Sequence, residues 1–353
     1  MSAATTTTKT HVVSLGIERL RGILSGDLSG LAPLTMLVGP SGSGKSTILD
    51  ALLIGTHPLP GEALGRAVAR RGGFDGARWL RHRRAPSPDT AIAVTMAGGP
   101  TTRTSFREEL GPSARAIEKL ERRGARGPFT HYEGTSEADG SSSSFVVTLA
   151  FDGSYYPEDD DARELVRNVR LIDSFQPFLA RPLASRFQEL RDRGHDAVVG
   201  ETVRSLFPGF DRIEVAAASD GSATLHLSGP DSTIPLDFVG DGGRLAIRCA
   251  IELAGVRSGL ALLEEPEAHL HPRGVSLLAG VIAGVVERGV QVIVSTHSLE
   301  LIDALVEHAG QLGIEDDAIS LVRTLLRSGS LVTDVLTGAD VKAKRTIVEE
   351  DLR

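Results

Sequence analysis

The chain has 353 residues, a formal net charge of −8, 41% apolar residues and 24% charged residues, the balance of a soluble globular protein with one large or two ordinary domains. Its one cysteine, Cys249, excludes an intramolecular disulfide and a cysteine-only metal cluster. No apolar stretch reaches the about 20 residues that span a bilayer, and the N-terminus lacks an apolar signal core. We therefore expect a cytoplasmic protein without membrane contact.

The first elements predict a strand, a glycine-rich loop and a helix. Residues 11–15 and 34–38 have strand character, and residues 46–54 have an apolar helical pattern. The loop between them fits G-x4-G-K-[ST], the phosphate-binding loop, whose backbone N–H groups and following helix cradle a polyphosphate. Lys45 adds a charge for the β- and γ-phosphates, and the Ser46 hydroxyl is a ligand for Mg²⁺. The predicted nucleotide-binding residues are Gly39, Pro40, Ser41, Gly42, Ser43, Gly44, Lys45, Ser46 and Thr47.

The next segment is basic. Residues 55–128 carry 14 Lys and Arg against 7 Asp and Glu, a net charge of +7 on an otherwise acidic chain. Its densest part holds Arg66, Arg70, Arg71, Arg78, Arg81, Arg83 and Arg84. Two interpretations stay open: a solvated, arginine-rich surface insert, or a local site for an anionic partner. Within it, residues 91–96 predict a strand and residues 113–123 a helix, and the low-complexity residues 133–144 predict a mobile linker.

The second half of the chain predicts an alternation of strands and helices. Strands are expected at 145–151, 169–173, 212–218, 223–228, 233–238, 260–264, 290–295, 319–326 and 331–336. Helices are expected at 182–191, 198–206, 244–254, 275–286 and 298–306. The strand–helix rhythm after residue 244 indicates a parallel sheet covered on both faces, and the last two strands indicate a hairpin around Ser328-Gly329.

Three further motifs carry candidate chemistry. The apolar strand 260–264 ends in paired acids, of which Glu264 is expected to hold Mg²⁺ and Glu265 to orient or deprotonate the attacking water. The strand 290–295 leads to His297, which in this context is expected to face the γ-phosphate. A glycine-rich helix start provides a second anion site, formed by Gly240, Gly242 and Gly243. Asn168 is the one asparagine and no T-K-x-D element occurs, which disfavours GTP.

These motifs, in this order, resemble the ABC-type ATPase superfamily, and most closely the AAA-15/AAA-21 group of stand-alone ATPases related to OLD-family ATPases and RecF. The matching stretches are PLTMLVGPSGSGKSTILDALLIG, FVGDGGRLAIRCAIELA, LALLEEPEAHLHP and VQVIVSTHSLELID, about a third of the chain. The resemblance implies an α/β, ABC-type P-loop fold with a mostly parallel sheet, an N-terminal antiparallel β part and an inserted region between two motif-bearing halves. The expected domains are an N-terminal lobe (1–58), a basic insertion (59–168), a C-terminal lobe (169–337) and a tail (338–353).

The resemblance also implies a function. It predicts a Mg²⁺-dependent ATPase in which each ATP lies between the phosphate loop of one copy and the glycine loop 240–243 of a second copy. Two departures stand out: there is no glutamine before Gln176 to form the transporter-type glutamine loop, and the signature loop lacks its serine. The spacing of His269 and His271 suits a metal site, but the family pattern places both in the loop that follows the acids.

Three outputs of such an ATPase stay open. The first is DNA repair or phage defence with a separate nuclease, in which DNA contacts the Arg66–Arg84 region. The second is a regulatory switch for a protein effector, without DNA. The third is a P-loop kinase for a small molecule, which the predicted pairing of Glu265 with His297 disfavours.

Overall fold

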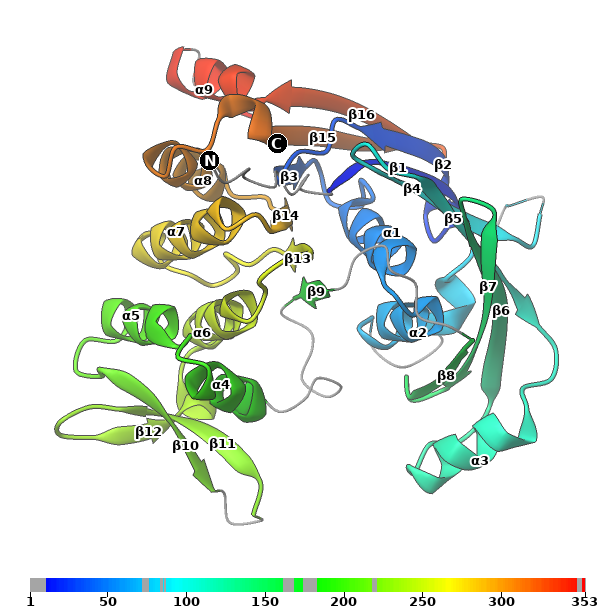
Figure 1. Ribbon diagram of the computed structural model, residues 1–353, viewed down its shortest axis with the longest axis horizontal. Coiled ribbons are helices and arrows are strands. Elements are labelled where there is room, and N and C mark those ends of the chain that lie inside the picture. Colours follow the sequence, from blue (N-terminus) through cyan, green and yellow to red (C-terminus); the bar gives the residue numbers. More distant parts are fainter. Residues whose placement is uncertain are drawn as a thin grey trace, which may run out of the picture. The chain divides into compact units, whose positions relative to one another are not determined.

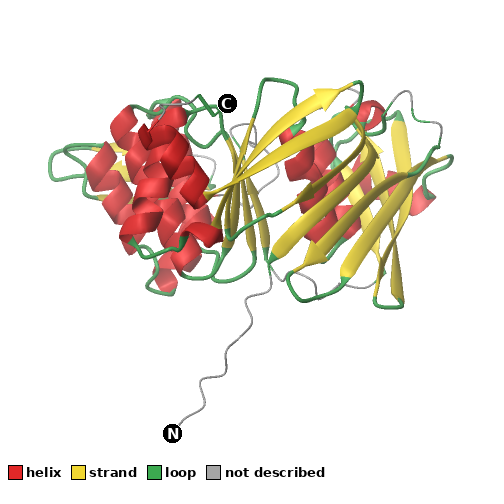
Figure 2. Ribbon diagram, turned by 90° about the horizontal axis from the view of Figure 1, so that it is seen from above, coloured by secondary structure: helices red, strands yellow, loops and turns green. Residues whose placement is uncertain are grey.

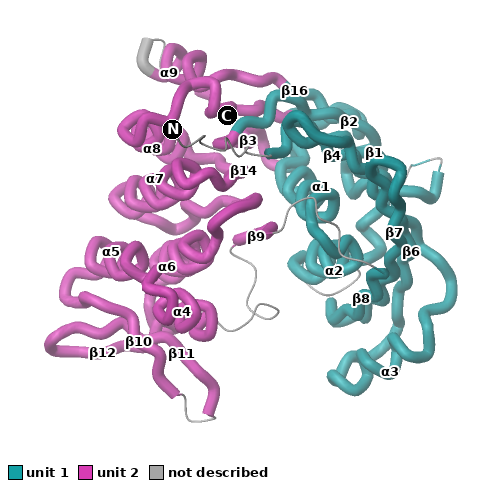
Figure 3. The backbone as a smooth tube through the Cα atoms, in the orientation of Figure 1, with its two compact units in different colours: residues 1–32, 42–167, 325–333 teal, residues 33–41, 168–324, 334–353 magenta. Residues whose placement is uncertain are grey.

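The structure is a computed structural model that describes residues 11–71, 76–82, 85, 87–160, 168–173, 183–217, 221–347 and 351–352. The chain divides into two compact units (Figure 3). Unit 1 contains residues 1–32, 42–167 and 325–333, and unit 2 contains residues 33–41, 168–324 and 334–353.

Unit 1 is built on an antiparallel sheet. Its strands are β1 (Val12–Leu20), β2 (Ile23–Ser29), β4 (Thr90–Met96), β5 (Thr101–Glu109), β6 (Phe129–Ala138), β7 (Ser141–Ala150) and β8 (Tyr155–Asp159). They lie in the order β8-β7-β6-β5-β4-β1-β2, and each neighbouring pair is antiparallel. The strands of the predicted basic insertion, β4 to β8, therefore extend the N-terminal sheet, because β4 pairs directly with β1. The predicted domain boundary at 58/59 stays a prediction.

Two helices, α1 (Lys45–Thr56) and α2 (Pro60–Ala69), pack against the strands of this sheet, which twist around them (Figures 1 and 2). Two helical glycines mark the close contacts. A Cβ on Gly55 of α1 would lie 2.6 Å from the Val94 side chain of β4, and one on Gly65 of α2 would lie 2.2 Å from the Tyr155 ring of β8. The backbones can approach so closely only because these positions carry no side chain. The remaining helices of unit 1 are α3 (Ala114–Arg122) and the short η1 (Gly76–Trp79).

The predicted mobile linker at residues 133–144 is wrong, because these residues form most of the β6–β7 hairpin. The pairing runs from Phe129↔Ala150 to Ala138↔Ser141. The turn is Asp139-Gly140, with φ values of 47° and 78°, the left-handed pair that a two-residue hairpin turn requires. Composition suggested disorder, but the serines and threonines alternate between the two faces, and buried Ser136 lies 3.2 Å from Thr104 of β5.

Unit 2 is built on a parallel sheet. Its strands are β3 (Leu34–Val38), β9 (Val169–Ile172), β13 (Leu260–Glu264), β14 (Gln291–Ser295) and β15 (Ile319–Arg327, whose last residues belong to unit 1). They lie in the order β15-β3-β14-β13-β9, and all four pairings are parallel. Helices α6 (Asp241–Ala254), α7 (Pro272–Glu287) and α8 (Leu299–Gln311) bury their apolar side chains with those of these strands in one core.

A second apolar core lies on the other side of α6. There α4 (Leu183–Asp192) and α5 (Ala197–Leu206) pack against a small antiparallel sheet of β10 (Arg212–Ala217), β11 (Ala223–Ser228) and β12 (Thr233–Pro235). The other elements are η2 (Leu236–Phe238), η3 (Asp316–Ala318), β16 (Ser330–Thr337) and α9 (Gly338–Ile347). No helix among the described residues is both long and apolar enough to cross a bilayer.

The predicted α/β fold, with a mostly parallel sheet and an N-terminal antiparallel part, is confirmed. The strands at 34–38 and 260–264 have the predicted bounds, and the closing hairpin turns at Ser328 and Gly329 with φ values of 50° and 87°. The sequence did not predict β2, β5, β6, β8, α2 or α9. Residue 182, the first of the helix expected at 182–191, lies outside the described residues.

Candidate functional site

The glycine-rich loop links β3 to α1 and has the backbone of an anion-binding loop. Gly42 and Gly44 have φ values of 81° and 97°, and a Cβ on Gly42 would meet nothing within 4 Å. Helix α1 begins at Lys45, and no side chain caps its first turn. An anion can accept hydrogen bonds from the N–H groups of such a helix start, which is consistent with the predicted phosphate site. All residues of α1 except Ser46 are buried.

The paired acids lie at the carboxyl end of the parallel sheet. In the strand register Glu264 lies opposite Ser295, and Ser295 lies opposite Leu37, the residue before the end of β3. Three neighbouring strands therefore end side by side, and the last of them, β3, enters the phosphate loop. Glu264 is buried, whereas the Glu265 side chain is 49% exposed.

Glu265 and His297 face each other. The His297 Nε2 atom is 3.5 Å from a carboxylate oxygen of Glu265. The Glu265 backbone has a φ of 45°, in the left-handed region that glutamate rarely adopts, and its N–H donates to the Ser295 carbonyl at 2.9 Å. A strained backbone at the end of a strand is typical of functional sites. The structure thus brings the two predicted catalytic side chains together; their roles stay predictions.

Glu267 and Thr296, for which no role was predicted, connect the same two loops. The Thr296 hydroxyl donates to a carboxylate oxygen of Glu267, and the His297 N–H donates to the same oxygen at 3.3 Å. The signal that could have revealed Glu267 was a third acid, three residues after the buried end of β13.

The three glycines of the predicted signature loop differ in their surroundings. A Cβ on Gly242 would lie 2.3 Å from the carbonyl oxygen of His269, and one on Gly243 would lie 2.4 Å from the Phe207 ring, so packing within the chain requires both glycines. Gly240 is the N-cap of α6, has a φ of −58°, and its Cβ would meet nothing within 4 Å. Of the three glycines, Gly240 is therefore the one at which an added side chain can test for a contact with another molecule without a clash inside the chain.

The histidines of the H-x-H pattern have separate structural roles. His271 is the N-cap of α7, where its Nδ1 accepts the Arg273 N–H at 3.3 Å, and His269 has a left-handed backbone with φ 64°. Across the described part of the chain, no group of three His, Cys, Asp or Glu side chains is placed to hold a metal ion.

Part of the arginine-rich segment is buried around one carboxylate, which neither interpretation of its charge anticipated. Asp50 of α1 is fully buried, and Arg70 donates to it at 2.7 Å. Arg21 and Arg71 place their Nε atoms 3.0 Å and 3.6 Å from its other oxygen. The Arg70 side chain is 1% exposed, and burial lowers the pKa of Arg21. Arg83 and Arg84 lie outside the described residues.

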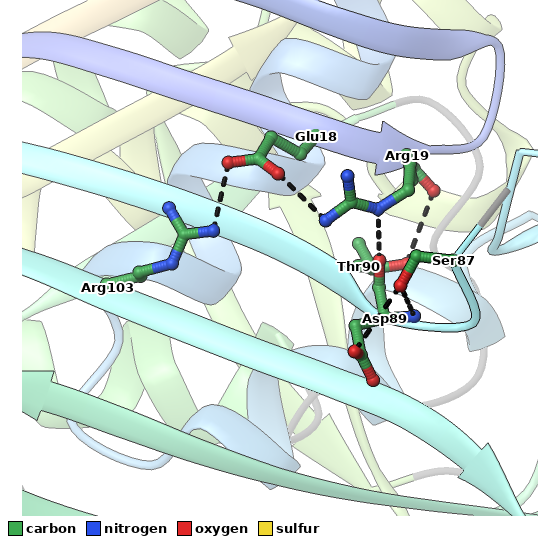
Figure 4. A network of polar contacts seen from close by, with 6 residues as sticks. All are labelled: Glu18, Arg19, Ser87, Asp89, Thr90 and Arg103. Carbon is green, nitrogen blue, oxygen red and sulfur yellow. Dashed lines mark hydrogen bonds and ion pairs between the residues drawn. The ribbon is translucent and has the colours of Figure 1, made fainter. Parts of the chain in front are cut away.

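Other cations of the segment are paired on the surface of the sheet. Arg103 donates to Glu18 at 2.9 Å, and Glu18 also pairs with Arg19 at 2.8 Å, in a network that continues to Asp89 and Thr90 (Figure 4). The hydrogen bond from Arg103 is the largest contribution that lowers the pKa of Glu18.

Exposed basic residues lie on α3 and the loop that follows it, in addition to the exposed Arg78 and Arg81 of the densest part of the segment. Arg115, Lys119 and Arg122 recur at helical spacing on one face, and Arg123 and Arg126 follow; all five are exposed. Arg122 pairs with Glu118 on the same helix. In Figure 1 this helix lies at the end of unit 1 beyond β8, apart from α1 and α2.

A phosphate loop at the end of one parallel strand, with paired acids and a histidine at the ends of the next two, defines a P-loop ATPase fold of the ABC type. The chain matches the family described as "AAA domain, putative AbiEii toxin, Type IV TA system" over residues 34–303, and it belongs to that family.

The chain is also similar to one curated protein in sequence and to solved structures in fold. An uncharacterized protein of Methanocaldococcus jannaschii is 32% identical over 116 residues, 33% of this chain and 99% of that protein. A crystal structure of the Smc head bound to the C-winged helix domain of ScpA has a TM-score of 0.52 at 14% identity, covering 93% of this chain and 98% of that one. An Smc head with an extended coiled coil bound to the C-terminal domain of ScpA, from Pyrococcus furiosus, has a TM-score of 0.51 at 12% identity, covering 97% and 100%. The likeness to the two Smc heads shows the fold.

Proposed function

We propose that this chain is a Mg²⁺-dependent ATPase that works as an ATP-bridged dimer and drives or regulates an effector. The observation that carries the proposal is the Glu265–His297 pair, held at the strand ends next to the strand that enters the phosphate loop. Family membership supports nucleotide hydrolysis in general.

The residues divide the chemistry as follows. The loop N–H groups and Lys45 bind the β- and γ-phosphates. Ser46 and Glu264 offer the hydroxyl and carboxylate oxygens that suit Mg²⁺, which neutralises phosphate charge when bound. The Glu265 carboxylate accepts a proton from the attacking water, and His297, beside it, orients that water or the γ-phosphate. A small-molecule kinase is the less favoured alternative, and acceptor-independent ATP turnover by the purified protein would exclude it.

Dimerisation should depend on ATP and on Gly240. In a Glu265→Gln background, light scattering should show a monomer without nucleotide and a dimer with ATP and Mg²⁺. Gly240→Asp should abolish that dimer: two like charges 4 Å apart repel by about 4 kcal/mol at an effective dielectric constant of about 20, which weakens association more than about 100-fold. Within the chain the change is tolerated, because the site is open and Asp is a favoured N-cap.

Gly240→Asn is the matched control, because it has the same size and capping ability without the charge, and should weaken the dimer far less. Gly242→Asp is unsuitable, because its Cβ would collide with the His269 carbonyl in the same chain. A protein that stays monomeric with ATP and hydrolyses it at full rate would refute the dimer.

The effector is a protein, nucleic acid or both. The Smc heads to which the chain is similar were crystallised with domains of ScpA, which favours a protein effector with or without DNA. The exposed cations of α3 favour an additional polyanion such as DNA. Together with the exposed Arg78 and Arg81 of the Arg66–Arg84 region they are the candidate contacts, whereas Arg70 is buried. If the protein acts in DNA repair or phage defence, the proposed protein effector is a separate nuclease.

If DNA is bound, the α3 surface should set the salt dependence of binding. Changing Arg115, Lys119 and Arg123 to Ala should reduce the slope of log affinity against log salt by about one unit for each phosphate that the variant no longer neutralises. Arg193, Arg257 and Arg288, exposed elsewhere, form a control triple of equal charge. If both triple variants reduce the salt slope equally, α3 has no special role in DNA binding. If the wild-type protein does not bind DNA at low salt, a protein effector is the remaining alternative.

A further inference from the structure

The Glu267 side chain joins the loop after β13 to the loop after β14. One of its oxygens, Oε1, accepts both the Thr296 hydroxyl and the His297 backbone N–H. Thr296 is fully buried, and its Oγ1 in turn accepts the Ser298 N–H at 2.9 Å, at the start of α8. The Thr296 N–H donates to the Leu37 carbonyl at 3.0 Å, next to the end of β3. Glu267 therefore lies in a continuous set of hydrogen bonds across three strand ends.

A charged side chain is an expensive way to satisfy these donors. Burial raises the pKa of Glu267, with a smaller contribution from the nearby charge of Glu265. The second oxygen, Oε2, is buried and has no hydrogen-bond partner among the described residues. A neutral residue with one acceptor oxygen would satisfy Thr296 and His297 at a lower desolvation cost. What the strand ends require of residue 267 is therefore an acceptor oxygen held in place, and not its charge.

We infer that Glu267 is a positioning residue that fixes the His297 backbone and so holds the imidazole beside Glu265. The inference rests on the proposed ATPase function. Glu265 is held on its own side by the bond from its N–H to the Ser295 carbonyl. The peptide N–H of His297 is held by the carboxylate of Glu267. The 3.5 Å separation of Glu265 and His297 then depends on the hydrogen bond that each backbone N–H donates.

Loss of Glu267 should lower turnover without weakening ATP binding. Glu267→Ala should reduce kcat about 10- to 100-fold and leave the KM for ATP within about twofold, because a displaced His297 impairs the water-orienting step while the phosphate loop is unchanged. Glu267→Gln retains an acceptor oxygen and should restore most of the activity. Thr296→Val removes the hydroxyl donor and should cause a smaller loss, whereas Thr296→Ser should not. Glu300→Ala, at an exposed acid on α8, is the control.

A readout independent of activity separates this inference from the ATPase proposal. NMR titration of histidine-labelled protein, with the His297 signal assigned by His297→Gln, should show that Glu265→Gln shifts the His297 titration in the parent protein. The same change should have a much smaller effect in Glu267→Ala, because the ring is then no longer held beside residue 265.

The outcomes are distinguishable. An unchanged effect of Glu265→Gln in the Glu267→Ala background would overturn the positioning role even in an active ATPase. A loss of coupling in a protein that hydrolyses no ATP would uphold the positioning and reject the proposed function. If Glu267→Ala does not fold, the effect of Glu265→Gln on the His297 titration is measured in Thr296→Val instead. A folded Glu267→Gln protein without restored turnover would count against the inference.

Discussion

Glu265→Gln is expected to bind ATP normally and to hydrolyse it about 10²–10⁴-fold more slowly, the range for loss of a general base. The amide keeps the shape of the side chain and a polar contact for His297, but it cannot take a proton from water. The side chain is half exposed and its strained backbone is fixed by the Ser295 carbonyl, so the folded state should not change. Single-turnover kinetics with radiolabelled ATP, beside equilibrium binding, measures both quantities.

Lys45→Ala is the complementary variant, because it should weaken nucleotide binding itself while leaving the Glu265–His297 pair intact. Normal ATP affinity with slow hydrolysis in Glu265→Gln, and weak ATP affinity in Lys45→Ala, would separate nucleotide binding from the hydrolysis step. Hydrolysis by Glu265→Gln at the parental rate would show that another group activates the water and that the assignment of Glu265 is wrong.

Asp50→Asn is expected to lower the free energy of unfolding by about 3–5 kcal/mol, because it leaves buried guanidinium groups without their carboxylate. Arg70 is almost completely buried and Arg21 is 14% exposed, so solvent replaces little of the missing attraction. Urea unfolding followed by circular dichroism measures the change. Unit 1 carries the whole cluster, so a separate early transition assigned to that unit would be an equivalent result.

Arg122→Ala provides the control, because Arg122 makes an i, i+4 pair with Glu118 on the exposed surface of α3, a contact worth about 0.3–0.5 kcal/mol. Arg71→Ala should lie between the two, because its side chain is 26% exposed and its ion pair is longer. A destabilisation below about 1 kcal/mol for Asp50→Asn would mean that the arginines find other partners.

The parts of the fold that sequence predicted are those with strong local signals. A mostly apolar run followed by G-x4-G-K-S predicts β3, the loop and α1, because few other structures bury such a strand beside such a loop. The meeting of Glu265 and His297 was predictable, since both follow apolar strands of one parallel sheet, whose carboxyl ends share an edge. The hydrogen bonds from Thr296 and His297 to Glu267 were not predictable, because they depend on the direction in which each loop turns after its strand.

The errors have physical causes too. Residues 133–144 are polar on both sides of Asp139-Gly140, and a sheet strand with one solvated face looks like a linker when only composition is counted. A charge count also treats arginines as exposed. The missing observation was Asp50, a single acid inside the apolar run ILDALL, which needs buried cations around it. The difference between Gly240 and Gly242 was not predictable either. It arises because the backbone of His269, 27 residues further along the chain, lies against Gly242 and not against Gly240.

The helix that begins at Lys45 cannot shift by itself. Its flanks are buried along its length, Gly55 lies against β4, and Asp50 ties its middle to Arg21 in the β1–β2 turn and to Arg70 at the end of α2. A force applied at the first turn, where a polyphosphate would be held, is therefore shared by the sheet and both helices of unit 1. In the proposed function, the far strands of unit 1 and α3 would therefore respond to a bound polyphosphate together with α1, and not independently of it.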